Sequence, residues 1–215
     1  YFSRALEVYS EAQPPTDTET IEDMEYHICS CYYGLRQLSP TGHYLRLAEE
    51  FYGDFIVEHP SSFRAPRAAM MLAAFWTERA WDGVTDREKA VKQVERTLAL
   101  IRQDSPPHVL SRLHLMAGEL LYMEDREEEA LDHLDKAIWH AQDDGDSLAK
   151  RRTLVFAHYY ALEACRTLGD NERCVPHAEY LVKNPPKSQE ELFNTNFGNF
   201  LDYIEQRVKP FAEKQ

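Results

Sequence analysis

Hydrophobic residues recur along most of the chain with the spacing of an α-helix. Leu45, Ala48, Tyr52, Phe55 and Ile56 illustrate the pattern, because they lie three, four and seven residues apart and so share one helix face. Proline and glycine interrupt the pattern at intervals, and β-branched runs bounded by turn residues are absent from the sequence. The chain is therefore predicted to be all-α, with helices over 1–13, 19–38, 41–59, 63–81, 86–104, 106–124, 126–143, 147–168, 171–184 and 189–213.

The predicted helices pair into hairpins that repeat at near-constant spacing. The second helix of each hairpin carries a small residue 40 to 44 positions from its counterpart, a period typical of stacked helical hairpins. Residues four and seven positions further on share its helix face, and two helix axes approach closely only where side chains are small. The aligned sets are Ala5, Ala48, Ala90, Ala130 and Cys174, then Tyr9, Tyr52, Val94, Leu134 and Ala178, then Ala12, Phe55, Thr97, Ala137 and Leu181.

One stretch, AGELLYMEDREEEALDHLDKAI, carries a family resemblance. Gly118 stands where the tetratricopeptide repeat family has a small first-helix residue, and residues 125–127 stand at its tight turn. Ala130, Leu134 and Ala137 match the second-helix pattern, so the stretch resembles a tetratricopeptide repeat. The repeats here exceed the 34 residues of that family, and HEAT-like or proteasome-lid-like repeats have similar periods, so the subfamily stays open.

Two further segments carry weaker copies of the same pattern. LAEEFYGDFIVEHP matches through Ala48, Tyr52 and Phe55, and a later copy places Cys174 at the alanine position. The resemblance implies one α-solenoid domain over 1–215 that forms a right-handed superhelix. Its parts are a leftover second helix over 1–13, hairpins over 19–60, 63–104, 106–143 and 147–186, and a closing helix over 189–213.

In such a solenoid the first helices line a concave groove, and the resemblance implies which residues face it. These residues combine aromatic rings with Arg and Glu, the types that dominate binding surfaces. They are Arg112, Leu115, Glu119, Tyr122, Phe156, Tyr159, Glu163 and Arg166. The function predicted from them is a non-catalytic scaffold that binds a protein or peptide, although the same aromatics could instead pack between adjacent hairpins.

Charge narrows the choice of partner. The chain has 215 residues, with 24 Lys and Arg against 37 Asp and Glu, a net charge of −13 that would repel phosphate backbones. Nucleic acid is therefore excluded as the main partner, and the sequence holds no apolar run long enough for membrane insertion. Since Tyr1 begins what reads as a broken repeat, we expect a longer native chain and a possible homodimer through the exposed terminal repeat.

Cysteine and histidine side chains are the other candidates, as metal ligands or as disulfide partners. His27 and Cys31 share a helix face but Cys29 points elsewhere, so these residues cannot complete a tetrahedral metal site. Cys165 and Cys174 flank a hairpin turn, where either a disulfide or two packed thiols would fit. Neither G-x-S-x-G nor H-E-x-x-H occurs in the sequence. The sequence predicts no catalytic residue, metal or cofactor, and four cysteines favour reduced thiols in a cytoplasmic protein.

Two other functions remain open from the sequence. The helical array could sense a small ligand as the regulatory module of an enzyme, which would require a deep enclosed pocket. Alternatively, FIVEHPSSFRAPRAA resembles hairpin junctions of bacterial lipoproteins built from such repeats, which would make the protein a periplasmic or outer-membrane assembly factor.

Overall fold

A computed structural model describes residues 18–35, 43–81, 83, 87–102, 104–142, 147–188, 192 and 197–213. The predicted helix 1–13, with the aligned Ala5, lies outside these residues. The chain divides into two compact units, one made of residues 1–75 and 96–105 and the other of residues 76–95 and 106–215. The stacking of all hairpins into one solenoid stays a prediction.

Helices account for the regular structure throughout the described ranges, which contain no strand, so the all-α prediction is confirmed. None of the described helices is long and apolar enough to cross a bilayer. Their bounds are α2 Thr18–Leu35, α3 His43–Glu58, α4 Ala65–Trp81, α5 Arg87–Leu100, α6 Pro107–Met123, α7 Glu127–Gln142, α8 Leu148–Leu168, α9 Asn171–Lys183, α10 Phe197–Tyr203, the π-helix η3 Ile204–Val208 and α11 Lys209–Ala212.

In the first unit, α2 and α3 pack against each other through aromatic side chains. Tyr26 of α2 lies edge-on to Tyr52 and Phe55 of α3, with ring centroids 6.2 and 6.0 Å apart. The Tyr52 hydroxyl donates to Ser30 Oγ at 3.3 Å, which satisfies its one polar group in an otherwise apolar contact. Tyr52 and Phe55 are the residues that the periodic pattern placed on one face of this helix.

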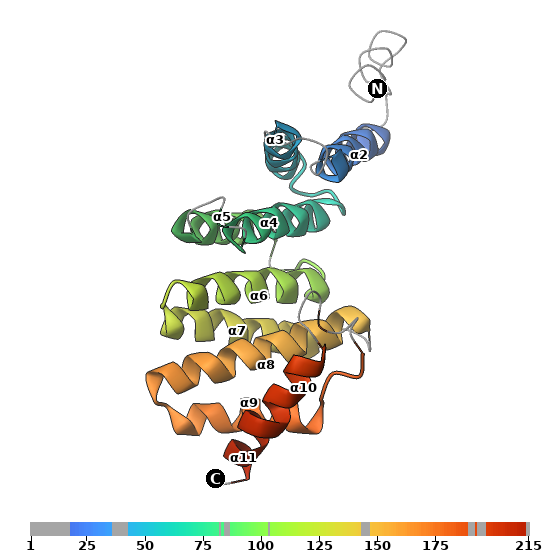
Figure 1. Ribbon diagram of the computed structural model, residues 1–215. Helices are drawn as coiled ribbons and strands as arrows, with labels where there is room; N and C mark the ends of the chain where they lie inside the picture. The colour runs from blue at the N-terminus through green and yellow to red at the C-terminus, as the bar shows by residue number, and fades with distance from the viewer. Residues whose placement is uncertain are drawn as a thin grey trace. The chain divides into compact units, whose positions relative to one another are not determined.

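In the second unit, α6, α7, α8 and α9 lie as successive layers (Figure 1). Short turns make neighbours antiparallel, and local residues fix where each helix starts and stops. Gly169 ends α8 with φ 73°, a left-handed conformation that glycine adopts without a Cβ clash. Asp170 then accepts a hydrogen bond from the Arg173 amide at 3.0 Å and caps α9. Ser147 caps α8 in the same way, through the Lys150 amide at 3.0 Å.

Gly118 marks the closest approach within the α6–α7 hairpin. A Cβ added there would lie 2.6 Å from Leu134 Cγ, 2.8 Å from Leu134 Cδ2 and 3.1 Å from the Ala130 carbonyl oxygen. Real Cβ atoms essentially never come within 3.0 Å of such neighbours, so the α6 backbone sits this near to α7 because residue 118 has no side chain. The partner of Gly118 is thus mainly Leu134, with Ala130 contributing its backbone.

Among the described residues, the aligned small positions of the second helices are buried. Ala48, Ala90, Ala130 and Cys174 are at most 1% exposed, and the residues four positions further on are equally buried. Those seven positions further on are at most 2% exposed. The alignment at 40 to 44 residues therefore selects one buried face on α3, α5, α7 and α9.

The C-terminal part differs in form from the single helix predicted over 189–213. Leu192 lies in a short 3₁₀ turn, and the described helix runs from Phe197 through η3 to Ala212. In η3 the Lys209 amide donates to the Ile204 carbonyl, five residues back. Pro210 has no N–H to offer the carbonyl of Gln206, and the hydrogen-bond register shifts at that point.

Candidate partner-binding surface

The eight residues implied by the resemblance fall into two clusters within the second unit. The α6 cluster contains Arg112, Leu115, Glu119 and Tyr122, and the α8 cluster contains Phe156, Tyr159, Glu163 and Arg166. Helices α6 and α8 contact each other directly, so the two clusters lie on neighbouring first helices. Each cluster is organised around one glutamate.

Glu119 is the centre of the α6 cluster. Its Oε1 accepts a hydrogen bond from the Tyr160 hydroxyl of α8 at 2.8 Å and from the Trp81 indole N–H of α4 at 3.0 Å. Burial raises the pKa of Glu119, while these two bonds and the nearby charge of Arg112 oppose the rise. One carboxylate oxygen thereby joins side chains from three helices.

Arg112 lies close enough to Glu119 for the opposite charges to interact. Burial lowers the pKa of the Arg112 guanidinium, and the Glu119 charge works in the other direction. The two opposite charges therefore stabilise each other's ionised form in this half-buried region. Leu115 is 2% exposed, so it belongs to the core and is not available to a partner.

Two aromatic side chains stand at the solvent side of this cluster. Trp81 is 53% exposed, yet its indole is held by Glu119. Tyr122 is half-buried, with its ring centroid 5.8 Å from that of Tyr160. An exposed aromatic ring held in one position loses little conformational entropy when a partner covers it.

The α8 cluster is covered by the chain's own C-terminal helix. The Tyr203 hydroxyl donates a short hydrogen bond to Glu163, and Arg166 bonds the same carboxylate at 2.7 Å. Arg166 also donates to the Tyr203 hydroxyl at 3.1 Å and to the Arg207 carbonyl at 3.0 Å. Its guanidinium lies 5.3 Å from the centroid of the Phe211 ring.

Aromatic rings extend the same contact. Phe200 lies 5.4 Å from Tyr159 and 6.3 Å from Phe156, measured between ring centroids. Phe156 is only 7% exposed. The α8 cluster therefore serves intramolecular packing, which was the alternative left open for these aromatics.

The two clusters share one interaction at equivalent positions. Tyr160 donates to Glu119 across 41 residues, and Tyr203 donates to Glu163 across 40 residues. The two glutamates are themselves 44 residues apart, on α6 and α8. Tyr203 of the C-terminal helix thus makes to Glu163 the same kind of hydrogen bond that Tyr160 makes to Glu119.

Sequence reasoning missed Trp81, Tyr160 and Tyr203 as members of this surface. All three reach a glutamate from another helix, at separations of 38 to 41 residues. The recurrence of a tyrosine about one repeat after each glutamate is the signal that could have found two of them.

The remaining candidates from the sequence are cysteine and histidine side chains. Cys165 and Cys174 are buried free thiols, and burial raises the pKa of Cys165 to about 12. His27 is exposed whereas Cys29 is buried, so the two do not share a site. Over the described ranges, one group of His and carboxylate side chains brings its ligand atoms within 4.8 Å of one another, namely Glu25, Glu58 and His59 of the first unit.

Comparison with known proteins found no matching family model, no matching curated protein and no matching solved structure.

Proposed function

We propose that this chain is a non-catalytic scaffold of the tetratricopeptide-repeat kind, whose first-helix surface around Trp81 and Tyr122 binds a peptide segment of a partner protein. The proposal rests on two features. One is the repeat character of the hairpins. The other is that side chains of α4 and α8 converge on Glu119 of α6, where hydrogen bonds hold Trp81 and Tyr160 in place. The observation that carries it is an exposed tryptophan whose indole N–H donates to a half-buried glutamate.

Chemically equivalent contacts in successive hairpins support the repeat character. His114 Nδ1 of α6 lies 3.1 Å from His133 Nδ1 of α7, and His158 Nδ1 of α8 lies 3.0 Å from His177 Nδ1 of α9. Both members of the second pair stand 44 residues after those of the first. Two hairpins that reproduce the same histidine pair in the same register are best explained as copies of one unit.

The surface around Trp81 has the composition of a binding hot spot. Tryptophan, tyrosine and arginine are the residue types that carry most binding energy in protein interfaces. Here Trp81, Tyr122 and Arg112 lie around Glu119, whose carboxylate is already engaged by Trp81 and Tyr160. A partner therefore meets preformed aromatic surface and needs little rearrangement of this chain.

Selection of peptides against the full chain tests the proposal. A displayed peptide library would supply binders, and isothermal titration calorimetry would measure their affinity for the wild-type chain and for Trp81→Ala and Tyr122→Ala variants. We expect each change to weaken binding by about thirtyfold or more, since hot-spot truncation costs about 2 kcal/mol or more.

Trp139→Ala is the matched control. Trp139 is also exposed, at 61%, but it lies on the second helix α7. Its loss should leave the affinity within twofold of wild type. Equal effects of Trp81→Ala and Trp139→Ala, or a failure to select any peptide, would contradict the proposal. The regulatory-module and assembly-factor functions stay predictions from the sequence, as do the homodimer and the cytoplasmic location.

A further inference from the structure

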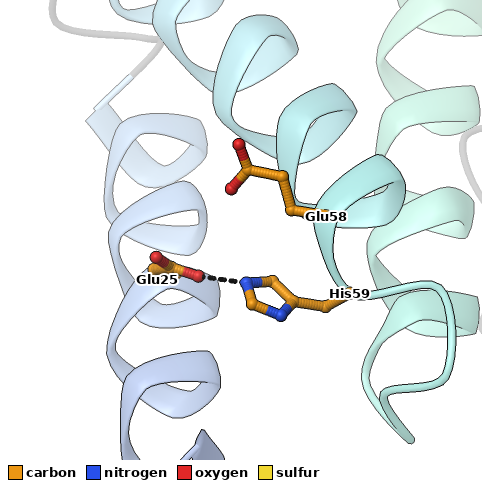
Figure 2. A group of neighbouring side chains, drawn as sticks. All are labelled: Glu25, Glu58 and His59. Carbon is orange, nitrogen blue, oxygen red and sulfur yellow. Dashed lines mark hydrogen bonds and ion pairs between the residues drawn. The ribbon is translucent and has the colours of Figure 1, made fainter.

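The α2–α3 hairpin gathers three carboxylates around one histidine. His59 follows directly after the last residue of α3, and its Nε2 lies 2.6 Å from Glu25 Oε2 of α2 (Figure 2). Its Nδ1 lies 3.8 Å from Glu22 Oε1. Glu58 adds a third carboxylate, and ligand atoms of Glu25, Glu58 and His59 all lie within 4.8 Å of one another.

The backbone and a neighbouring ring hold His59 in this position. Its amide donates to the Phe55 carbonyl at 2.9 Å, which continues the hydrogen-bond ladder of α3 by one residue. Its ring centroid lies 5.1 Å from that of Phe55, which is itself only 2% exposed. Phe55 therefore holds the imidazole against α2, whereas the Glu25 side chain is half-buried and the Glu58 side chain is exposed.

Negative charge exceeds positive charge within this group. Glu22, Glu25 and Glu58 bring three carboxylates to one imidazole. The neighbouring Arg64 is engaged elsewhere, since its Nε and Nη2 both lie 2.5 Å from Asp23 Oδ1 and its guanidinium lies over the Tyr26 ring at 5.3 Å. A divalent cation placed among these carboxylates would offset their negative charge.

We propose that Glu25, Glu58 and His59 form a binding site for a divalent cation of the zinc class, with Glu22 as the residue that orients the imidazole. The cation takes the position between His59 Nε2 and Glu25 Oε2, and the proton held there passes to solvent. Histidine nitrogen together with carboxylate oxygen suits Zn²⁺, whereas Mg²⁺ and Ca²⁺ prefer oxygen ligands alone. A carboxylate near the second ring nitrogen is the usual partner of a metal-bound histidine.

The required movement is small. Two ligands on a tetrahedral zinc ion lie about 3.3 Å apart, given bonds of about 2.0 to 2.2 Å. His59 Nε2 and Glu25 Oε2, now at 2.6 Å, must therefore separate by about 0.7 Å. Glu25 is 35% exposed, so rotation of its side chain can supply that distance. Glu58 is exposed, and its ligand atom, within 4.8 Å of the other two, must approach by up to about 1.5 Å, which side-chain rotation can also supply while α2 and α3 keep their positions.

Zinc bound here would link two helices through residues 34 positions apart in the sequence. Such a link closes the α2–α3 hairpin in the manner of a structural metal, because a ligand that binds only the folded form stabilises it. The proposed zinc site therefore stabilises the α2–α3 hairpin of the first unit. This role is separate from the peptide-binding function proposed for the second unit.

Zinc titration of the full chain tests the site. We expect about one Zn²⁺ per chain with a dissociation constant in the micromolar range by calorimetry, and visible absorption bands of a four-coordinate ion when Co²⁺ is added instead. His59→Gln should weaken zinc binding by at least tenfold and abolish those bands. Glutamine can still donate to Glu25, so the hairpin should keep its helical circular dichroism signal.

His43→Gln is the matched control, because His43 is an exposed histidine at the other end of the same helix. It should leave zinc affinity unchanged. The proposal is overturned if 100 μM zinc (about a hundred times a micromolar dissociation constant) does not bind, or if His59→Gln binds zinc as wild type does. Equal weakening by His59→Gln and His43→Gln would overturn it too, since that result indicates scattered surface histidines.

Discussion

Replacement of Gly118 by alanine tests the close approach of α6 and α7 most sharply. Alanine normally stabilises a helix interior by about 0.8 to 1 kcal/mol relative to glycine. At residue 118, however, the new Cβ meets Leu134 Cγ at 2.6 Å and Leu134 Cδ2 at 2.8 Å. Leu134 is fully buried and the Ala130 carbonyl, 3.1 Å away, is backbone, so neither neighbour can move aside cheaply.

Overpacking of this kind costs about 1 to 3 kcal/mol, and two contacts below 3.0 Å place Gly118→Ala in the upper part of that range. After the gain in helix propensity, we expect a net loss of about 1 to 2 kcal/mol in the free energy of unfolding. The melting temperature should fall by about 2 to 8 °C, because 1 kcal/mol shifts it by about 2 to 4 °C in a chain of this size.

Gly53→Ala provides a control of opposite sign. Gly53 lies inside α3, and a Cβ there meets nothing within 4 Å. This variant should therefore gain about 0.8 to 1 kcal/mol. Urea unfolding followed by circular dichroism measures both variants, and tryptophan fluorescence reports the second unit alone, since Trp76, Trp81 and Trp139 all belong to it. The packing is refuted if Gly118→Ala stabilises the chain as Gly53→Ala does.

Three further predictions concern the same unit. Ala130→Leu should lower the free energy of unfolding by about 1 to 3 kcal/mol, because residue 130 is fully buried. An unchanged urea midpoint would show that the contact between α6 and α7 has room for a larger side chain. Tyr203→Phe removes a hydroxyl that is hydrogen-bonded to Glu163 and Arg166, so the free energy of unfolding should fall by about 1.5 to 3 kcal/mol. Tryptophan fluorescence during urea unfolding measures this loss. An unchanged urea midpoint would mean that the C-terminal helix is held by its aromatic contacts alone. Burial lowers the pKa of His114 and of His158 from 6.5 to about 3, so the unfolded chain binds protons first as the pH falls. The free energy of unfolding should have its full value above pH 6.5 and should fall towards pH 3, by up to about 1.4 kcal/mol per pH unit for each histidine. A urea midpoint that does not change between pH 6.5 and pH 5 would contradict the burial of these histidine pairs.

Helix positions were predictable where local signals agreed. The sequence predicted helices over 106–124 and 126–143, and the structure has α6 Pro107–Met123 and α7 Glu127–Gln142. Hydrophobic periodicity and an acidic turn both mark that boundary, and Asp125 adopts φ 54° there. The π-helix in the C-terminal segment was not predictable, because a shift from α- to π-helix near Pro210 leaves the spacing of apolar residues almost unchanged.

The surface was predictable only in part, because periodicity gives the face of a helix but not what covers it. Glu119 and Tyr122 are half-buried on α6, whereas Leu115 and Phe156 are buried within the packing. The contact of His59 with Glu25 spans 34 residues and depends on the pairing of α2 with α3. Contacts of that range follow from tertiary packing, which single-sequence patterns do not specify.

Site-specific cross-linking tests the central claim, that a partner peptide lies on the first-helix surface. A photoreactive phenylalanine analogue would replace Tyr122 in one variant and Trp139 in a second. Each would be irradiated with a bound peptide obtained by selection against the full chain. The account predicts an efficient cross-link from residue 122 and only background from residue 139. A cross-link from residue 139, with none from residue 122, would contradict it.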